Sequence, residues 1–467
     1  MKKIVFMLVA FSFHISIYAA NLLEVYQEAI VSDPVYQQNI AQALATAENA
    51  NISLANLLPN IGATARPYLM KQVTSGPANI YNPSDRRRGY NVNLSITQTV
   101  FDFAKFANFA QTRAQAKQAS ATLNAAAQDL MIRVAKAYFQ VLEDEDNLRS
   151  SFSTKVAFSR QLDQGNQQYK VGIKTITDVY TAEASYESSV AEYITALNQL
   201  ENDRENLRAI TGKLYASLDK LSEDFPLIKP NPANIESWVK IATHQNWQIK
   251  AAQYATLAAK KNITQQFADH FPTLNVQGTY DVNFTRDFGG TDPVLDINPP
   301  GPGQTHTSTI MANVGIPLFQ GGLVLAQTRQ AKDNYRYTSQ VLEQQLRTAM
   351  NMTRQSYLNI LAGISKIEAD RKAIRSSISS LEGMEAGYRV GTEILVNVLD
   401  QQQKVLVNQK QYAHDRYAYV INLLTLKQAA GTLSPDDLAA INAWLHEGQP
   451  FREELPPQLK KERQHAL

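Results

Sequence analysis

The sequence predicts an α+β fold made of two similar halves, each with a pair of β-strands followed by very long helices. Three observations support this prediction: an internal repeat, segments of strict polar–apolar alternation, and apolar residues at helical spacing over long stretches. The chain has 467 residues and no cysteine. It therefore has neither a disulfide framework, nor a lipid-acceptor cysteine, nor a thiol nucleophile.

The first twenty residues have the features of a cleaved secretory signal. Two lysines precede an apolar run from Ile4 to Ile17, which is too short to span a bilayer. We expect a signal peptide over residues 1–20, cleaved after Ala19 or Ala20. Polar residues recur every few positions in the rest of the sequence, so no transmembrane helix is expected there.

The charge pattern argues against nucleic acid as a partner. The chain carries 45 basic and 43 acidic residues, a formal net charge of +2, without a basic face interleaved with aromatic residues. Its seven histidines are scattered, and none has a metal-ligating neighbour at helical spacing. We therefore expect no enzyme activity, no cofactor and no metal site.

The chain contains two copies of one unit. Tyr169-Lys-Val-Gly172 recurs as Tyr388-Arg-Val-Gly391, and Gly212-Lys-Leu214 recurs as Gly431-Thr-Leu433, both 219 positions later. The two matches lie some forty residues apart and keep the same offset, which indicates a tandem duplication. The expected divisions after the signal are repeat 1 over residues 21–214, an inter-repeat segment over 215–245, repeat 2 over 246–433, and a C-terminal segment with a flexible tail over 434–467.

Each copy has two segments with the two-residue period of β-strands. In the clearest one, Tyr90, Val92, Leu94 and Ile96 alternate with polar residues, whereas Pro67 interrupts the weakest one. The expected strands cover about residues 61–72, 89–101, 273–286 and 306–319. Each is close to the ~9–11 residues that cross a bilayer obliquely.

The surroundings of these strands fit a membrane protein. The connections from Ser75 to Arg88 and from Asp287 to Gln304 are rich in Gly, Pro, Asn and Asp, which is typical of exposed loops. Aromatic residues near the strand ends fit an interfacial girdle: Tyr68, Tyr90, Phe101, Phe103, Tyr280 and Phe284. The alternative is a water-soluble β-hairpin with one polar face.

Long helices are predicted for the remainder of each repeat, over residues 102–212 and 320–430. Apolar residues recur there in steps of three and four: Leu123, Ala127, Leu130, Val134, Ala137 and Val141, and Tyr357, Ile360, Ile364, Ile367, Ile374, Ile378, Leu381, Met384 and Tyr388. A sustained seven-residue repeat favours left-handed supercoiling of long helices. Residues 103–168 alone would form a helix of ~95 Å, longer than a compact domain.

Four strands cannot close a membrane barrel, because an open sheet edge in lipid leaves backbone groups without hydrogen bonds. Several chains must therefore pool their strands. Two chains would give eight strands and three would give twelve, and the count alone leaves both open. Helices that continue from the sheet would extend the same wall, so the expected assembly is a tube.

Five longer motifs lie in the predicted strands and around the predicted helix ends: Ser95-Ile-Thr-Gln-Thr-Val-Phe-Asp102, Gly165 to Val179, Ile316-Pro-Leu-Phe-Gln-Gly-Gly322, Met384-Glu-Ala-Gly-Tyr-Arg-Val-Gly-Thr392 and Ala429-Ala-Gly-Thr-Leu433. On these motifs the chain closely resembles the TolC-type outer-membrane efflux proteins, the outer membrane factor family. The resemblance covers nearly the whole sequence after the signal.

This resemblance implies an α+β membrane channel-tunnel. The family forms a homotrimer whose twelve-stranded β-barrel, with four strands per protomer, continues into a long periplasmic α-helical barrel. A mixed α/β equatorial belt would come from the inter-repeat and C-terminal segments. The protein would lie in the outer membrane, in contact with its lipid, and extend into the periplasm.

The resemblance also implies a function. The expected protein is a passive exit duct of tripartite efflux pumps or type I secretion systems. It would be opened at its periplasmic end by a periplasmic adaptor and an inner-membrane pump or ABC exporter. The sequence does not specify the substrate, the pump or the adaptor. The alternative is an exported structural or adhesive coiled-coil protein with a β tip.

By the same resemblance, the periplasmic end is closed by inward-coiled helix pairs. Their turns, which would dock the adaptor, fall around Val171-Gly172 and Val390-Gly391, next to Tyr169 and Tyr388. Both tyrosines could equally be core residues that plug the turn.

In the family, two aspartates on successive turns of the second repeat face the tunnel axis. This sequence has Asn397 and Asp400 there. Threefold symmetry would give one ring of three carboxylates, which favours cations, and one neutral polar ring. Asp400 could instead belong to a solvated helix face.

Asp178 and the adjacent Thr177 are also expected at this gate. Asp178 matches a first-repeat aspartate that in the family links to an arginine and to the equivalent of Tyr388. Glu393 stands at the arginine position, so the expected attraction becomes repulsion. Our hypothesis is that Lys174 or Arg389 supplies the missing cation, or that closure is weaker here.

Asp178 also has a purely structural interpretation. Thr175-x-x-Asp178 follows a glycine-containing turn and fits a capping box at a helix N-terminus. The capping role and the gate role are compatible.

Overall fold

The computed structural model describes residues 19–73, 84–287 and 302–448. Residues 1–18 of the expected signal, most of both loops between paired strands and the end of the tail lie outside this range. The chain divides into two compact units. Unit 1 contains the residues up to Ile40, Leu123–Ile249 and the residues from Leu346 on, and unit 2 contains Ala41–Thr122 and Lys250–Gln345. Each unit thus takes segments from both repeats.

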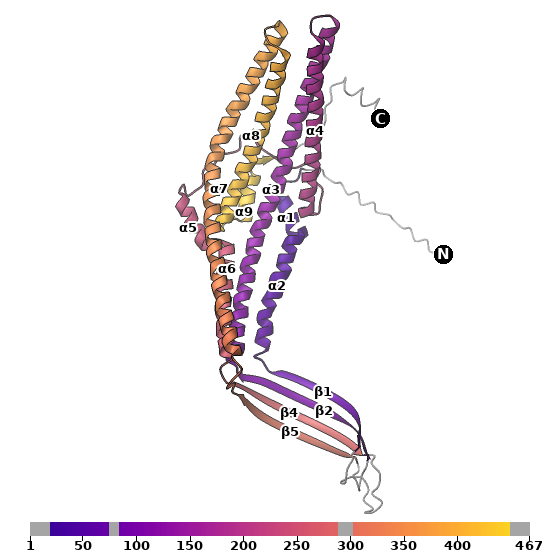
Figure 1. The fold of residues 1–467 in the computed structure, drawn as a ribbon, viewed down its shortest axis with the longest axis vertical. Coiled ribbons are helices and arrows are strands. Elements are labelled where there is room, and N and C mark those ends of the chain that lie inside the picture. Colours follow the sequence, from indigo (N-terminus) through magenta and orange to yellow (C-terminus); the bar gives the residue numbers. More distant parts are fainter. Residues whose placement is uncertain (1–18, 74–83, 288–301, 449–467) are drawn as a thin grey trace, which may run out of the picture. The chain divides into compact units, whose positions relative to one another are not determined.

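The two repeats form matching helices (Figure 1). The long helices α3 and α7 both have 68 residues, and α4 and α8 both have 36. The helices in the described part of the chain are α1 Leu22–Ser32, α2 Pro34–Ala55, α3 Phe103–Lys170, α4 Ile176–Thr211, α5 Ile235–Gln245, α6 Trp247–Ala268, α7 Leu323–Val390, α8 Leu395–Ala430 and α9 Pro435–Asn442. None of these helices combines the length and the apolar character that crossing a membrane requires.

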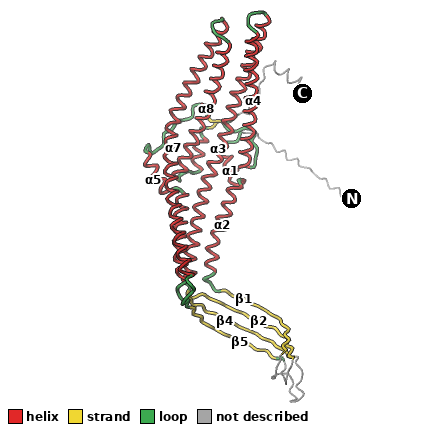
Figure 2. Tube along the Cα trace, in the orientation of Figure 1, coloured by secondary structure: helices red, strands yellow, loops and turns green. Residues whose placement is uncertain are grey.

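Unit 2 contains an antiparallel four-stranded sheet in the order β1-β2-β4-β5, whose strands lie side by side in Figure 2. Its strands are β1 Asn60–Val73, β2 Ser84–Phe101, β4 Thr273–Asp287 and β5 Gly303–Gly315. Because β2 pairs with β4, the hairpins of the two repeats join into one sheet. β5 stops before the expected residue 319, since Pro317 has no N–H to continue the ladder.

The sheet has one apolar and one polar face. Tyr90, paired with Phe284, and Val92, paired with Val282, lie on the apolar face. On the polar face, Asn93 Nδ2 donates a hydrogen bond to Asp281 Oδ1 over 2.7 Å. Large apolar side chains of the first face are strongly exposed in the single chain, as Ile310 at 85% shows. This face therefore needs an apolar environment outside the chain.

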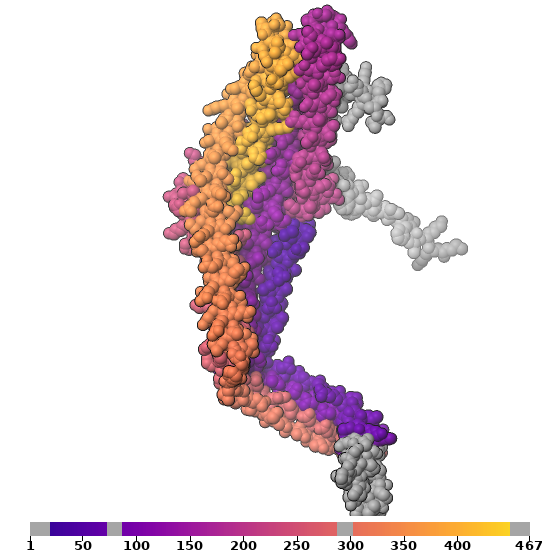
Figure 3. All heavy atoms as spheres, in the orientation of Figure 1, coloured from indigo at the N-terminus to yellow at the C-terminus, as the bar shows by residue number. Residues whose placement is uncertain are grey.

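Unit 1 is held by a core between its long helices. The seven-residue apolar stripes predicted from the sequence supply much of it, with Leu130 and Val134 of α3 and Ile360 and Ile367 of α7 almost fully buried. In Figure 3, α7 and α8 run side by side along the visible face. They pack closely enough that a Cβ at Gly363 would lie 3.5 Å from Tyr419 Cβ.

The inter-repeat and C-terminal segments form the mixed α/β belt expected from the family resemblance. β3 Lys220–Leu221 pairs with β6 Leu445–His446, and Ala20 forms a parallel bridge with Leu218. The buried Tyr138 hydroxyl donates a hydrogen bond to the Asp219 carbonyl oxygen over 2.7 Å. A core tyrosine of α3 therefore anchors the belt.

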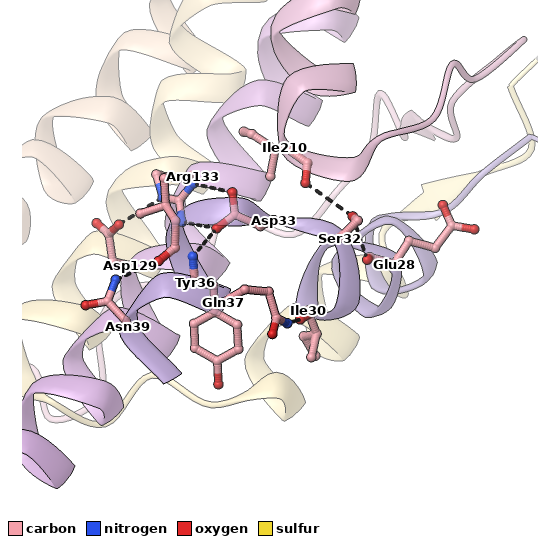
Figure 4. Close-up of polar contacts among 11 residues, drawn as sticks. Glu28, Ile30, Ser32, Asp33, Tyr36, Gln37, Asn39, Asp129, Arg133 and Ile210 are labelled. Carbon is pink, nitrogen blue, oxygen red and sulfur yellow. Dashed lines mark hydrogen bonds and ion pairs between the residues drawn. The ribbon is translucent and has the colours of Figure 1, made fainter. Parts of the chain in front are cut away.

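A buried ion pair fixes the junction of α1 and α2 against α3 (Figure 4). Asp33, 2% exposed, accepts two hydrogen bonds from the Arg133 guanidinium, at 3.0 and 2.7 Å, and one from the Tyr36 N–H. Burial alone would raise the pKa of Asp33, but these hydrogen bonds outweigh it and the pKa is lowered. The Ser32 hydroxyl donates to the Thr211 carbonyl oxygen and so ties α1 to the end of α4.

Candidate functional site

Each pair of long helices in unit 1 is joined by a tight turn (Figure 2). Gly172 follows α3 with φ +78°, and Gly391 follows α7 with φ +86°. The Gly172 N–H bonds to the Tyr169 carbonyl, and the Ile173 N–H to the Gln168 carbonyl, both over 2.9 Å. This pair of bonds defines a Schellman motif, which ends a helix and favours glycine because of its left-handed backbone.

The second turn repeats this backbone. The Thr392 N–H bonds to the Gly387 carbonyl over 2.9 Å, and the Gly391 N–H to the Tyr388 carbonyl over 3.3 Å. The recurrence of Tyr-x-Val-Gly in the sequence therefore corresponds to a recurrence of one helix-ending geometry.

The helix that follows the first turn is capped by side chains. The Asp178 N–H donates to Thr175 Oγ1 over 3.2 Å, and Asp178 Oδ2 accepts from the Thr175 N–H over 3.1 Å. These reciprocal bonds form a capping box at the start of α4. The capping interpretation of Asp178 is thus confirmed, while its part in a gate stays a prediction.

The helix that follows the second turn lacks such a cap. Ile394 holds the N-cap position of α8 and makes no side-chain capping bond. Glu393 Oε2 instead accepts a hydrogen bond from Asn397 Nδ2 over 2.9 Å. Glu393 also lies against the preceding helix, since a Cβ at Gly387 would come within 2.8 Å of its Cγ. The Glu393 side chain, expected at the position of the family's arginine, is therefore engaged within its own turn.

The tips of the two hairpins contact each other. Lys174 Nζ lies 4.3 Å from the centre of the Tyr388 ring, the geometry of a cation–π interaction. The pKa of Tyr388 is raised, first by burial and then by the negative charge of Asp178. A small apolar cluster from three helices lies at the same junction: Phe158 of α3, Ala182 of α4, and Leu395 and Leu399 of α8.

Asp400 and Thr177 line one groove. Its volume is about 560 Å³, and α4 and α8 supply most of its lining, which includes Tyr180 and Gln403. Asp400 and Asn397 are both exposed on α8. The structure therefore brings Asp400 together with Thr177, while Asn397 contacts Glu393.

The predicted docking turns present apolar side chains to solvent. Val171 is 70% and Val390 is 76% exposed, and Tyr169 is also exposed. Arg389, the second candidate for the missing cation, is exposed as well. Within the described ranges, no group of three or more His, Cys, Asp or Glu residues could hold a metal ion.

The sequence analysis missed two pairs of carboxyl groups inside the helical hairpins. In the first hairpin, burial and then a hydrogen bond to Asp203 raise the pKa of Asp144 to about 8. In the second, burial and then a hydrogen bond to Asp415 raise the pKa of Asp370. The sequence contains an indication that Asp144 is buried, because it lies three residues after Val141 and so continues the apolar stripe of the helix.

Comparison with known proteins agrees with these elements. Residues 25–213 and 238–432 match the model of the outer membrane efflux protein family. The chain is 35% identical to the outer membrane protein TolC of Salmonella enteritidis, over 97% of this chain and 90% of that protein. It is 24% identical to the alkaline protease secretion protein AprF of Pseudomonas aeruginosa, over 91% of this chain and 87% of that protein.

The fold is shared with solved channels. The crystal structure of the Campylobacter jejuni CmeC outer membrane channel superposes with a TM-score of 0.74 at 15% identity, over 91% of this chain and 90% of that one. The fold is therefore that of an outer-membrane channel-tunnel. The chain belongs to the outer membrane efflux protein family. It lies in the outer membrane and serves there as an exit duct for efflux and secretion. The relatives that it matches are named as channel, efflux and secretion proteins rather than enzymes.

Proposed function

We propose that three copies of this chain form one duct, and that the tips of its helical hairpins form a periplasmic gate. The gate is closed at rest and opens when a periplasmic adaptor and an inner-membrane pump or ABC exporter engage the turns at Val171-Gly172 and Val390-Gly391. Tripartite efflux and type I secretion both use this arrangement. The observation that carries the gate proposal is the contact between the two tips, where Lys174 lies over Tyr388.

In this proposal, Lys174 supplies the positive charge that holds the tips together. Lys174 of the first repeat is equivalent to Glu393 of the second, because the two lie 219 positions apart. The positive charge expected at position 393 is therefore found at the equivalent position of the first turn. Glu393 accepts a hydrogen bond from Asn397 and lies against Gly387, so its carboxylate is held within its own turn. Lys174 and Tyr388 are both only partly buried, and a cation–π contact at such a site contributes about 0.5–1 kcal/mol, enough to shift a balanced equilibrium several-fold towards a closed state.

The exposed Asp400 would form the cation-selective constriction. By threefold symmetry its carboxylate is repeated around the axis, and three like charges that share a narrow opening attract cations and repel anions. Support comes from the exposure of Asp400 and from the small polar side chains, Thr177 and Ser188, that share its groove. Asn397 would contribute a neutral ring.

Single-channel conductance of the purified trimer tests the constriction. We expect a small, cation-selective current that a multivalent cation blocks from the periplasmic side, and we expect Asp400→Asn to weaken this block at least tenfold. Asp163→Asn, which removes an exposed carboxylate of α3 outside the groove, is the matched control. Equal block of wild type and Asp400→Asn would overturn the constriction, and failure to conduct would favour a structural coiled-coil protein.

The same recording tests the contact between the tips. Lys174→Met removes the charge but keeps much of the side-chain volume, so we expect a several-fold larger closed-state current. Glu393→Arg restores the cation of the family pattern, and we expect it to lower that current. If Lys174→Met left the current unchanged, Lys174 would not be the replacement cation.

A further inference from the structure

Four basic side chains gather at one end of the sheet, on its apolar face. They are Lys71 of β1, Arg86 and Arg88 of β2, and Arg286 of β4, and all four are exposed. In the strand register Lys71 stands opposite Arg86, and Arg88 stands opposite Arg286. Residues opposite one another share a face, so these four side chains form one patch, which we call the basic rim.

The basic rim continues an ordered sequence of side chains along the apolar face. Next to Arg88 and Arg286 come Tyr90 and Phe284, whose rings stack with centroids 5.2 Å apart. Val92 lies beyond Tyr90 on the same face. The order is therefore aliphatic, aromatic and then basic, which matches the hydrocarbon, interface and phosphate layers of a lipid leaflet.

The composition of this face favours an anionic ligand. Arg88 and Arg286 stand directly opposite each other and so place two guanidinium groups side by side on it. Among the residues of the apolar face whose side chains are described, none is acidic. The acidic Asp281 lies on the polar face, where it accepts a hydrogen bond from Asn93.

We propose that the basic rim binds the phosphate groups of a phosphorylated lipid in the leaflet at the loop end of the sheet. The arginine guanidinium donates paired hydrogen bonds that match phosphate oxygens, and the four exposed basic side chains offer several such donors on one patch. Lipid is the source rather than free phosphate, because the apolar and aromatic surface beside the rim binds acyl chains. The inference rests on the proposed trimeric duct, whose apolar face meets lipid.

The test uses the detergent-purified trimer and native mass spectrometry with added lipid A. We expect the wild-type trimer to retain lipid A carrying two phosphates, and the double substitution Arg88→Gln/Arg286→Gln to bind it at least about tenfold more weakly. Arg66→Gln is the matched control, since Arg66 is an exposed arginine of β1 on the polar face. We expect this control to bind lipid A as the wild type does.

Four results would overturn the proposal: unchanged lipid A binding by the double variant, equal weakening by Arg66→Gln, equal retention of lipid A from which the phosphates have been removed, or complete displacement of lipid A by inorganic phosphate at millimolar concentration. Trimer formation and single-channel conductance of the double variant are recorded in parallel. If the double variant conducts normally and binds lipid A as the wild type does, lipid binding by the basic rim is rejected and the proposed duct stands. A wild-type chain that neither trimerises nor conducts would reject the proposed duct.

Discussion

The two helical hairpins of unit 1 share a backbone but differ in how their tips are fixed. Both turns end a long helix with a left-handed glycine, Gly172 or Gly391. After the first turn, Thr175 and Asp178 cap α4. After the second, Ile394 offers α8 no side-chain cap. Duplication therefore preserved the element that reverses the chain, while the interactions that stabilise the following helix diverged.

This difference assigns separate roles to local and tertiary interactions. The start of α4 is stabilised by its own side chains, because the capping box satisfies N–H groups that the first turn of a helix leaves unpaired. The start of α8 depends on packing, with Leu395 and Leu399 buried against residues of the first hairpin. The second tip is therefore the one whose order depends on contact between hairpins.

The largest expected effect concerns the buried carboxyl pairs, since each of the two hairpins has one pair between its helices. The pKa of Asp144 is raised to about 8, so the folded state holds a proton that the unfolded chain releases near pH 4. The stability from this proton is complete at low pH and is lost as the pH rises toward 8. Between pH 6 and 8 the loss is about 2 kcal/mol.

Asp144→Asn keeps a hydrogen-bond donor for Asp203 without a titrating proton, so we expect it to flatten this pH dependence. The measurement is the midpoint of urea unfolding, followed by helical circular dichroism at pH 6 and 8. Asp370→Asn in the second hairpin is the comparison, and we expect a smaller change because Lys366 partly offsets the raised pKa of Asp370. Equal pH dependence of wild type and Asp144→Asn would contradict the shared proton.

The next effect tests what the two turns share. We expect Gly172→Ala and Gly391→Ala each to destabilise its turn by about 1–2 kcal/mol, because a Cβ is strained at positive φ. Neither position has a neighbour within 4 Å of a built Cβ, so steric contact adds nothing to this strain. Faster amide hydrogen exchange around each turn measures the effect. A substantial cost at only one turn would show that the two turns are not energetically equivalent.

The smallest effect tests what the two turns do not share. We expect Thr175→Ala to cost about 1 kcal/mol of local stability, seen as faster exchange of the first amides of α4. Ile394→Ala at the equivalent position of α8 removes no capping bond, so exchange there should change little. Similar acceleration in both variants would mean that the capping box does not distinguish the tips.

Part of the candidate site was open to prediction because its geometry is local. The capping box needs only Thr175 and Asp178 at the correct spacing, and the turn needs only a glycine after Tyr-x-Val. The bond from Asn397 to Glu393 was missed, although a separation of four residues on a helix permits it. The contact of Lys174 with Tyr388 joins residues far apart in the chain, and spacing gives no sign of it.

The sequence by itself determined the elements with regular periods: the duplication, the strands, and the long helices with their apolar stripes. These follow from side-chain periodicity and backbone preference, which act over a few residues. Only the tertiary structure decided that β2 adjoins β4, that Asp144 meets Asp203, and that Arg88 stands opposite Arg286. Such pairs depend on how distant segments align, and alignment is set by the packing of the whole unit rather than by any one segment.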